Sequence, residues 1–150
     1  MNTLRFLFAL AFLSSSNVFA ADWPTWGGDA TRNMVSLEED LDFDFDPGEM
    51  NDDESVNMET TTNIKWVAKL GSQAYGNVTI ANGRVFAGTN NESPRDSGKK
   101  GDRGVVMCFN EKSGNLEWQL VIPKLGAVKV SDWEYIGVCS SPAIEGNMVY

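Results

Sequence analysis

The 150-residue chain has no histidine, two cysteines and only 12 lysines and arginines against 21 aspartates and glutamates. The lack of histidine removes the commonest general base and the commonest metal ligand. The formal net charge of −9 argues against a nucleic-acid partner, because neutralising phosphates requires clustered basic side chains. The chain also lacks a recognisable nucleophile with its base, a phosphate-binding loop and a zinc cluster. We therefore predict no catalytic and no metal-binding residue in it.

Long apolar runs are confined to the N-terminus. Arg5 precedes eight apolar residues from Phe6 to Leu13, which are too few to span a bilayer, and a small-residue cleavage site ends at Ala20. We predict a secretory signal peptide over 1–20, cleaved after Ala20, and an exported protein, periplasmic or extracellular. An N-terminal membrane anchor is the alternative. Because no cysteine lies near the cut, a lipid anchor at that site is excluded, and no later stretch predicts a membrane span.

The two cysteines, Cys108 and Cys139, leave two interpretations open. After export, a disulfide between them would close a loop of about 30 residues and contribute about 3–4 kcal/mol on the chain-entropy model. Alternatively, each thiol packs as a small hydrophobe. We favour the second, because packing beneath a tryptophan suffices to explain Cys108.

The first part of the mature chain predicts two irregular segments. Residues 21–36 form a lead-in rich in tryptophan and glycine, which we expect to contact a folded body because Trp23 and Trp26 lie so close together. Residues 37–62 follow, and their first 23 positions hold eleven acidic residues and no basic one. We predict a solvated, partly disordered acidic loop there.

Part of this acidic loop resembles a calcium-binding loop. Asp42, Asp44 and Asp46 alternate with phenylalanines. However, Pro47 stands where the turn glycine is expected, and Asp53 stands where a bidentate glutamate is needed. The loop interpretation is therefore preferred over a metal site.

From residue 63 the pattern becomes all-β. Residues 64–69 alternate in polarity around Trp66, and the pair Asn82-Gly83 between two apolar runs is a strong hairpin signal. The runs that we predict as strands are 64–69, 78–80, 84–87, 105–109, 116–121, 142–144 and 148–150.

The run from Cys108 to Trp118 reads as a strand, a tight turn and a second strand. Asn110 can bond back to the turn backbone, Gly114 can adopt a positive φ, and Trp118 supplies a large flat anchor against a neighbouring unit. Ser113 occupies the remaining polar turn position.

An internal repeat is also visible. Trp66 recurs as Trp118, 52 residues later, and the segment 80–86 is echoed by 144–150 at an offset of 64. Because the two offsets differ by 12 residues, we predict that the second unit carries an insertion after Trp118, within 123–135. A period of this size with four short strands per unit indicates propeller blades.

These features resemble the quinoprotein-like β-propellers, which include pyrroloquinoline-quinone (PQQ) dehydrogenases and BamB-type assembly factors. The 108–118 run is similar to their A-x-D-x-x-T-G-x-x-x-W hairpin, with Cys108, Asn110 and Ser113 as substitutions, and the lead-in resembles their D-W-P-x-W-x-G start. The resemblance implies four-stranded blades over 63–150, about two blades' worth, continuing beyond residue 150. It also implies that segment 64–69 completes a blade whose other strands lie far along the chain.

The resemblance leaves two functions open. The first is a non-catalytic binding or scaffold module that recognises protein or polysaccharide through rim loops, with no cofactor; the charged loop 90–103 and the insertion with Trp133 are its candidate surfaces. The alternative is a PQQ-dependent dehydrogenase with calcium, for which Cys139 and Trp133 are the candidate cofactor-binding residues. The dehydrogenases carry a vicinal disulfide over the quinone, whereas Ser140 follows Cys139 here. We therefore favour the binding module.

Overall fold

The computed structural model describes residues 21–39, 41–124 and 133–150. The predicted signal peptide and residues 125–132 of the predicted insertion lie outside these ranges. The regular elements are the 3-10 turn η1 (Met58–Thr60) and the strands β1 (Thr79–Ala81), β2 (Arg84–Asn90), β3 (Arg103–Asn110), β4 (Leu116–Pro123), β5 (Ile144–Glu145) and β6 (Met148–Val149). The all-β prediction is confirmed. No helix in these ranges is long and apolar enough to cross a membrane.

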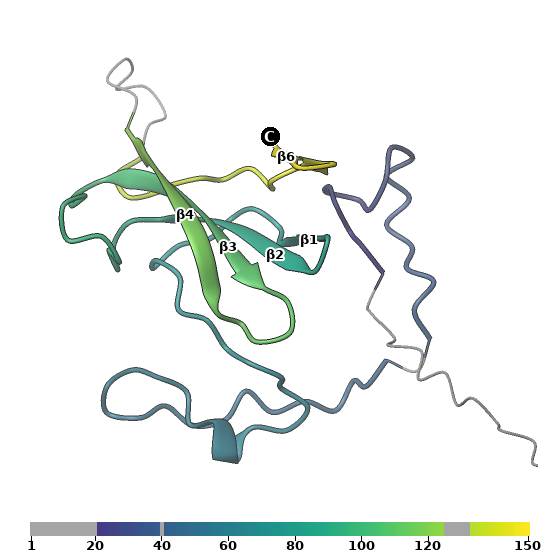
Figure 1. Cartoon of the computed structure of the whole chain (residues 1–150). Coiled ribbons are helices and arrows are strands. Elements are labelled where there is room, and N and C mark those ends of the chain that lie inside the picture. Colours follow the sequence, from purple (N-terminus) through teal and green to yellow (C-terminus); the bar gives the residue numbers. More distant parts are fainter. Residues whose placement is uncertain (1–20, 40, 125–132) are drawn as a thin grey trace, which may run out of the picture.

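Strands β1 to β4 form one antiparallel sheet in sequence order, and β5 and β6 form a separate hairpin (Figure 1). Asn82 and Gly83 connect β1 to β2 with φ values of 55° and 70°, the left-handed pair that a type I′ turn requires. The predicted strands 78–80, 84–87, 105–109 and 116–121 are therefore present and lie in one antiparallel sheet. Within the described residues the sheet is open, and its strands do not close into a ring.

The turn between β3 and β4 is built by side-chain chemistry that the sequence predicted. The Asn110 side-chain oxygen accepts hydrogen bonds from the backbone N–H groups of Lys112 and Ser113, both at 3.1 Å. Gly114 has a φ of 71°, which favours glycine. The local backbone conformation of this hairpin thus follows from its own residues.

Both faces of the sheet pack against other segments, and each face packs against a different one. Because neighbours along a strand point to opposite faces, Phe86 and Cys108 lie on one face, whereas Met107 and Phe109 lie on the other. The first face packs against Ile144 and Val149 of the β5–β6 hairpin, and the second packs against Trp66, Ala68 and Leu70. Burial on both faces explains why apolar residues follow one another without alternation over 85–88 of β2 and 104–109 of β3.

Segment 64–70, predicted as a strand over 64–69, differs from that expectation in one respect. Its residues alternate between half-buried and exposed, as in a strand with one face on a core, but it belongs to neither sheet. Its side chains are thus arranged as predicted, and in the described part of the chain no strand lies beside it to form a ladder.

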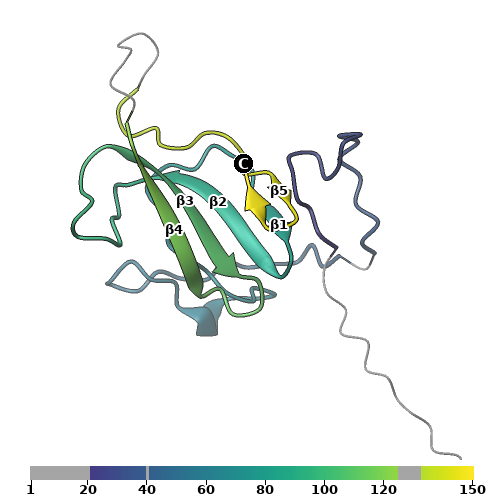
Figure 2. The same cartoon turned by 45° about the horizontal axis from the view of Figure 1, so that its top comes forward.

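The lead-in contacts both hairpins, as its tryptophans predicted. Trp23 pairs with Ile80 of β1 through two backbone hydrogen bonds of 2.7 and 3.0 Å, and the Pro24 carbonyl accepts one of 2.8 Å from the N–H of Ile144. In Figure 2 the β5–β6 hairpin lies beside β1. The side-chain amide of Asn82 donates to the Gly146 carbonyl at 3.0 Å, so the two turns related by the repeat are joined directly.

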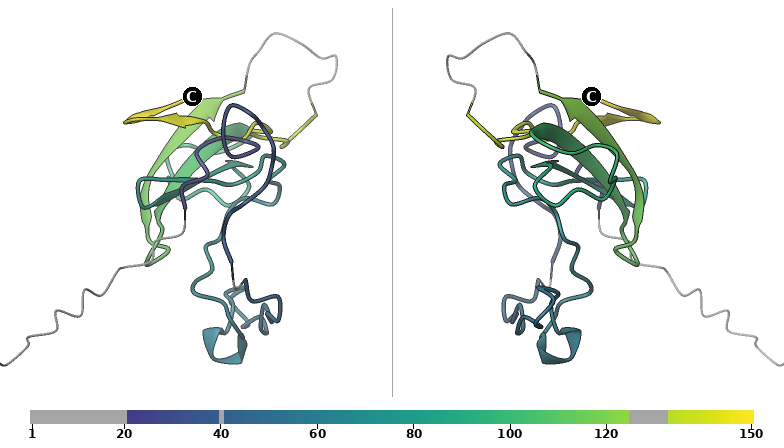
Figure 3. Two further views of the ribbon diagram at one scale, coloured as in Figure 1. Left: turned by 90° about the vertical axis from the view of Figure 1, so that its right-hand side faces the viewer. Right: turned by 90° about the vertical axis from the view of Figure 1, so that its left-hand side faces the viewer.

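The acidic segment leaves the body and returns to it. Figure 3 shows it projecting from the sheet in both views. Asp46 pairs with Thr62 at its base, and Met50 pairs with Val56 nearer its tip. The Asn63 side chain donates to a carboxylate oxygen of Asp42 at 2.6 Å, which further ties the base together.

Candidate functional site

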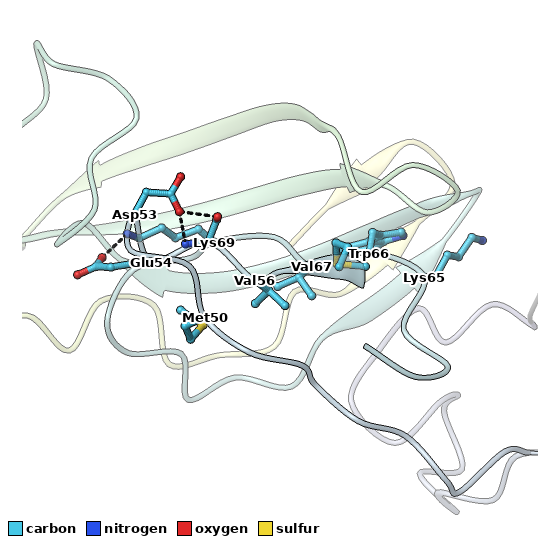
Figure 4. Close-up of a pocket in the computed structure, with 10 residues that line it drawn as sticks. Met50, Asp53, Glu54, Val56, Lys65, Trp66, Val67 and Lys69 are labelled. Atoms are coloured by element: carbon cyan, nitrogen blue, oxygen red, sulfur yellow. Dashed lines mark hydrogen bonds and ion pairs between the residues drawn. The ribbon is translucent and has the colours of Figure 1, made fainter. Parts of the chain in front are cut away.

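A pocket of about 780 Å³ lies between the acidic segment and segment 64–70 (Figure 4). We call it the acidic-loop pocket. It is lined by Met50, Asp53, Glu54, Ser55, Val56, Met58, Lys65, Trp66, Val67 and Lys69. The alternation of segment 64–70 explains one wall: the side chains that do not face the sheet point toward the acidic segment.

Charged groups gather at one end of this pocket. The ammonium of Lys69 lies 2.9 Å from a carboxylate oxygen of Glu54, and this hydrogen bond lowers the pKa of Glu54. Asp53 accepts hydrogen bonds from the hydroxyl and the N–H of Ser55, and the hydroxyl bond is the larger cause of its lowered pKa. Both carboxylates are therefore anionic at neutral pH.

The rest of the lining is largely apolar and accessible. Met50, Met58 and Val67 are 63%, 42% and 51% exposed. Methionine side chains are flexible and polarizable, so they adapt to apolar groups of different shapes. The pocket therefore combines an adaptable apolar wall with two lysines and two carboxylates, and one lysine and one carboxylate, Lys69 and Glu54, form an ion pair.

The charged loop 90–103, predicted as a candidate surface, is held by polar contacts within the loop and by contacts to the insertion. The side-chain nitrogen of Asn91 donates to the Lys99 carbonyl at 2.7 Å and to the Gly101 carbonyl at 3.2 Å. Asp102 accepts from the Lys124 ammonium at 2.7 Å and from the N–H of Tyr135 at 3.1 Å, and the bond from Lys124 is the main cause of its lowered pKa. The two bonds to Asp102 hold the loop against the described residues of the insertion.

Sequence reasoning missed the buried residue Asn90 at the end of β2. Its side-chain oxygen accepts from the N–H of Ser72 at 3.0 Å, and its nitrogen donates to the Ser72 hydroxyl at 2.9 Å and to the Tyr135 carbonyl at 2.6 Å. A polar residue ending a strand resembles an ordinary solvated loop residue in the sequence. Only the three-dimensional arrangement reveals that Asn90 joins three segments.

The two candidate cofactor-binding residues lie in different surroundings. Trp133 is 74% exposed, and its carbonyl accepts from the Lys124 ammonium at 3.2 Å. Cys139 is an exposed free thiol that lines a second pocket together with Trp26. Among the described residues, no group of three or more histidine, cysteine or acidic side chains is arranged to hold a metal ion.

The residues of the hairpin motif form contacts between segments. Trp66 donates its indole N–H to the Glu111 carbonyl at 2.8 Å, and its ring lies against Gly114. Trp118 lies across from Cys108 in the ladder, with its ring centroid 6.0 Å from that of Phe86. Cys108 is a buried free thiol, and burial raises its pKa to about 11.

The comparisons with known proteins assign this chain to no family: no family model, no curated protein and no solved structure matches it.

Proposed function

We propose that this chain is part of an exported, quinoprotein-like β-propeller repeat protein that binds a protein partner, without catalysis, through the acidic-loop pocket. The observation that carries the proposal is the accessible apolar wall of that pocket beneath a strongly acidic segment. Exposed apolar patches rimmed by polar residues are typical of protein-interaction sites.

The propeller part of the proposal is supported by the sheet and its covers. The sheet is a four-stranded antiparallel meander, and a different segment packs on each of its faces. In a propeller, blades stack face to face in the same manner. The bond between the Asn82 and Gly146 turns is consistent with successive units of one repeat.

The chemistry of the partner follows from the charge of the acidic segment. Eleven acidic residues and no basic one occupy 37–59, so a basic segment is favoured and an acidic one repelled. The apolar wall formed by Met50, Val56 and Val67 calls for apolar anchors between the basic residues. The partner is therefore a polypeptide segment that combines lysine or arginine with large apolar side chains.

The test uses fluorescently labelled peptides of alternating lysine and leucine, compared with a matched peptide of glutamate and leucine. Anisotropy titrations should show binding of the basic peptide at least roughly ten-fold tighter than that of the acidic one. Binding should weaken as salt is raised, because exposed charges are screened.

A pair of variants separates the pocket from the overall negative charge. Replacing both Met50 and Met58 by serine should weaken binding of the basic peptide, whereas Leu120→Ser, at a 55% exposed position on β4, should leave it unchanged. Equal binding of the two peptides, or equal loss in both variants, would overturn the proposal.

A further inference from the structure

A second pocket lies where three segments distant in sequence meet. It has a volume of about 390 Å³ and is lined by Thr25, Trp26, Arg32, Tyr75, Gly76, Asn77, Cys139 and Ser141. We call it the Trp26 pocket. It shares no lining residue with the acidic-loop pocket. Its volume falls within the range of small-molecule sites.

Close backbone approaches build this pocket. A side chain at Gly76 would place its Cβ 2.5 Å from the Ser140 carbonyl oxygen, so only glycine lets these two segments meet. The N–H of Asn77 donates to the Ser141 hydroxyl at 2.8 Å across the same junction. The pairing of Trp23 with Ile80 then fixes the lead-in that carries Trp26.

Arg32 is held in an unusual backbone conformation at the edge of this pocket. Its φ is 53°, a left-handed value that costs energy for a residue with a side chain. A Cβ at Gly27 would lie 3.0 Å from the Arg32 Cα, so the chain turns tightly here. Strained residues of this kind cluster at ligand sites. The turn places the Arg32 guanidinium carbon 5.9 Å from the centre of the Trp26 ring.

The lining combines three kinds of group. Trp26 and Tyr75 are 47% and 63% exposed and offer aromatic surface. Arg32 supplies a cation, and no acidic side chain is among the described lining residues. Thr25, Ser141 and Asn77 provide hydroxyl and amide groups that can exchange hydrogen bonds with a ligand.

We propose that the Trp26 pocket binds a carboxylated sugar, such as a uronic acid unit of a polysaccharide. The C–H groups of a sugar ring carry partial positive charge and pack on the negative face of an aromatic ring. A carboxylate accepts paired hydrogen bonds from the planar guanidinium of an arginine. A neutral sugar leaves the cation unused, and a simple carboxylate leaves the aromatic surface unused. This inference is independent of the proposed peptide site.

The test titrates the protein with D-glucuronate, D-glucose and acetate, and follows binding by ligand-observed NMR saturation transfer. We expect D-glucuronate to bind with a Kd of about 1 mM and the other two at least roughly ten-fold more weakly. Equal binding of acetate and glucuronate, or no binding of glucuronate up to about 50 mM, would overturn the inference.

Matched variants connect any binding to this pocket. Arg32→Gln should reduce glucuronate affinity to that of glucose, and Arg32→Lys, which keeps the charge, should retain part of it. Trp26→Ala should weaken both sugars. Arg84→Gln and Trp118→Ala change the same residue types outside the pocket and should leave affinity unchanged. Loss of binding in these controls as well, with the fold intact by circular dichroism, would place the site elsewhere.

Discussion

At the scale of single residues, the two cysteines differ in accessibility. Cys108 is buried and its pKa is raised to about 11 by desolvation, whereas Cys139 is exposed, and both are free thiols. Because the thiolate is the reactive form, we expect maleimide at neutral pH to modify Cys139 alone in the native protein. Mass spectrometry should count one adduct before unfolding and two after it. Native Cys139→Ser should give none, and no adduct even in denaturant without reductant would reveal a disulfide.

Two buried threonines on neighbouring strands provide a matched pair for stability. The Thr79 hydroxyl has no hydrogen-bond partner among the described residues, whereas that of Thr89 donates to the Gln73 carbonyl at 2.8 Å and accepts from the N–H of Gly71 at 2.9 Å. Both residues are fully buried. Valine has nearly the same shape as threonine without the hydroxyl.

We therefore expect the two threonine-to-valine changes to have opposite effects. Thr79→Val should raise the free energy of unfolding by about 1 kcal/mol, because it removes an unpaired buried polar group. Thr89→Val should lower it by about 1–3 kcal/mol, because the N–H of Gly71 loses its partner and the Gln73 carbonyl keeps only its bond from the N–H of Asn90. Denaturant titrations measure both. If Thr79→Val lost as much stability as Thr89→Val, the Thr79 hydroxyl would have to be hydrogen-bonded, contrary to the structure.

At the scale of elements, two turn glycines separate backbone strain from steric contact. Gly83 and Gly114 have φ values of 70° and 71°. A Cβ at Gly83 meets nothing within 4 Å, whereas a Cβ at Gly114 would lie 2.6 Å from the Trp66 ring. Their backbone demands are thus the same, and only their surroundings differ.

We expect Gly83→Ala to cost about 1–2 kcal/mol, the penalty of a left-handed alanine. Gly114→Ala should cost about 2 kcal/mol more, because the new methyl group displaces Trp66 from the turn. Unfolding titrations give the two values, and intrinsic fluorescence should change only for Gly114→Ala. Equal costs for the two variants would show that the Trp66 ring moves aside without a loss of stability.

The elements that the sequence predicted well are those set by local chemistry. Asn82-Gly83 and the residues from Asn110 to Gly114 determine their own turns, so the hairpins follow from neighbouring positions. The alternation over 64–69 correctly gave the buried face of that segment. It gave no indication of a hydrogen-bonded neighbour, and in the structure the segment packs on the sheet without joining it.

The candidate sites were far less predictable, because they depend on contacts between distant segments. The motif analysis gave Cys139 as a candidate cofactor-binding residue. In the structure Cys139 lines the Trp26 pocket together with Arg32 and Tyr75, and no sequence pattern had indicated these two residues. The acidic segment was predicted only as a solvated loop. Its contribution to a pocket with Lys65 and Val67 depends on how the chain returns from residue 62 to the sheet.

At the scale of the whole molecule, the two faces of the sheet are covered to different extents. Segment 64–70 covers the face that contains Val105 and Met107. On the opposite face the short β5–β6 hairpin covers Phe86 and Cys108, while an apolar stripe on β4 is left accessible. The stripe consists of Trp118, Leu120 and Ile122, which are 39%, 55% and 39% exposed. In the propeller that we propose, the next blade covers this stripe.

The tryptophans related by the repeat, Trp66 and Trp118, test this asymmetry. Trp66 packs against Phe109 with ring centroids 6.3 Å apart and donates its indole N–H to the Glu111 carbonyl, whereas Trp118 has ring contact with Phe86 and remains partly exposed. In residues 1–150, Trp66→Ala should therefore cost about 3–4 kcal/mol and Trp118→Ala about 1–2 kcal/mol. Both values come from denaturant unfolding.

If a further blade covers the stripe on β4, a longer chain that contains this blade should raise the cost of Trp118→Ala to about that of Trp66→Ala. An unchanged cost in that longer chain would argue against blade stacking on β4.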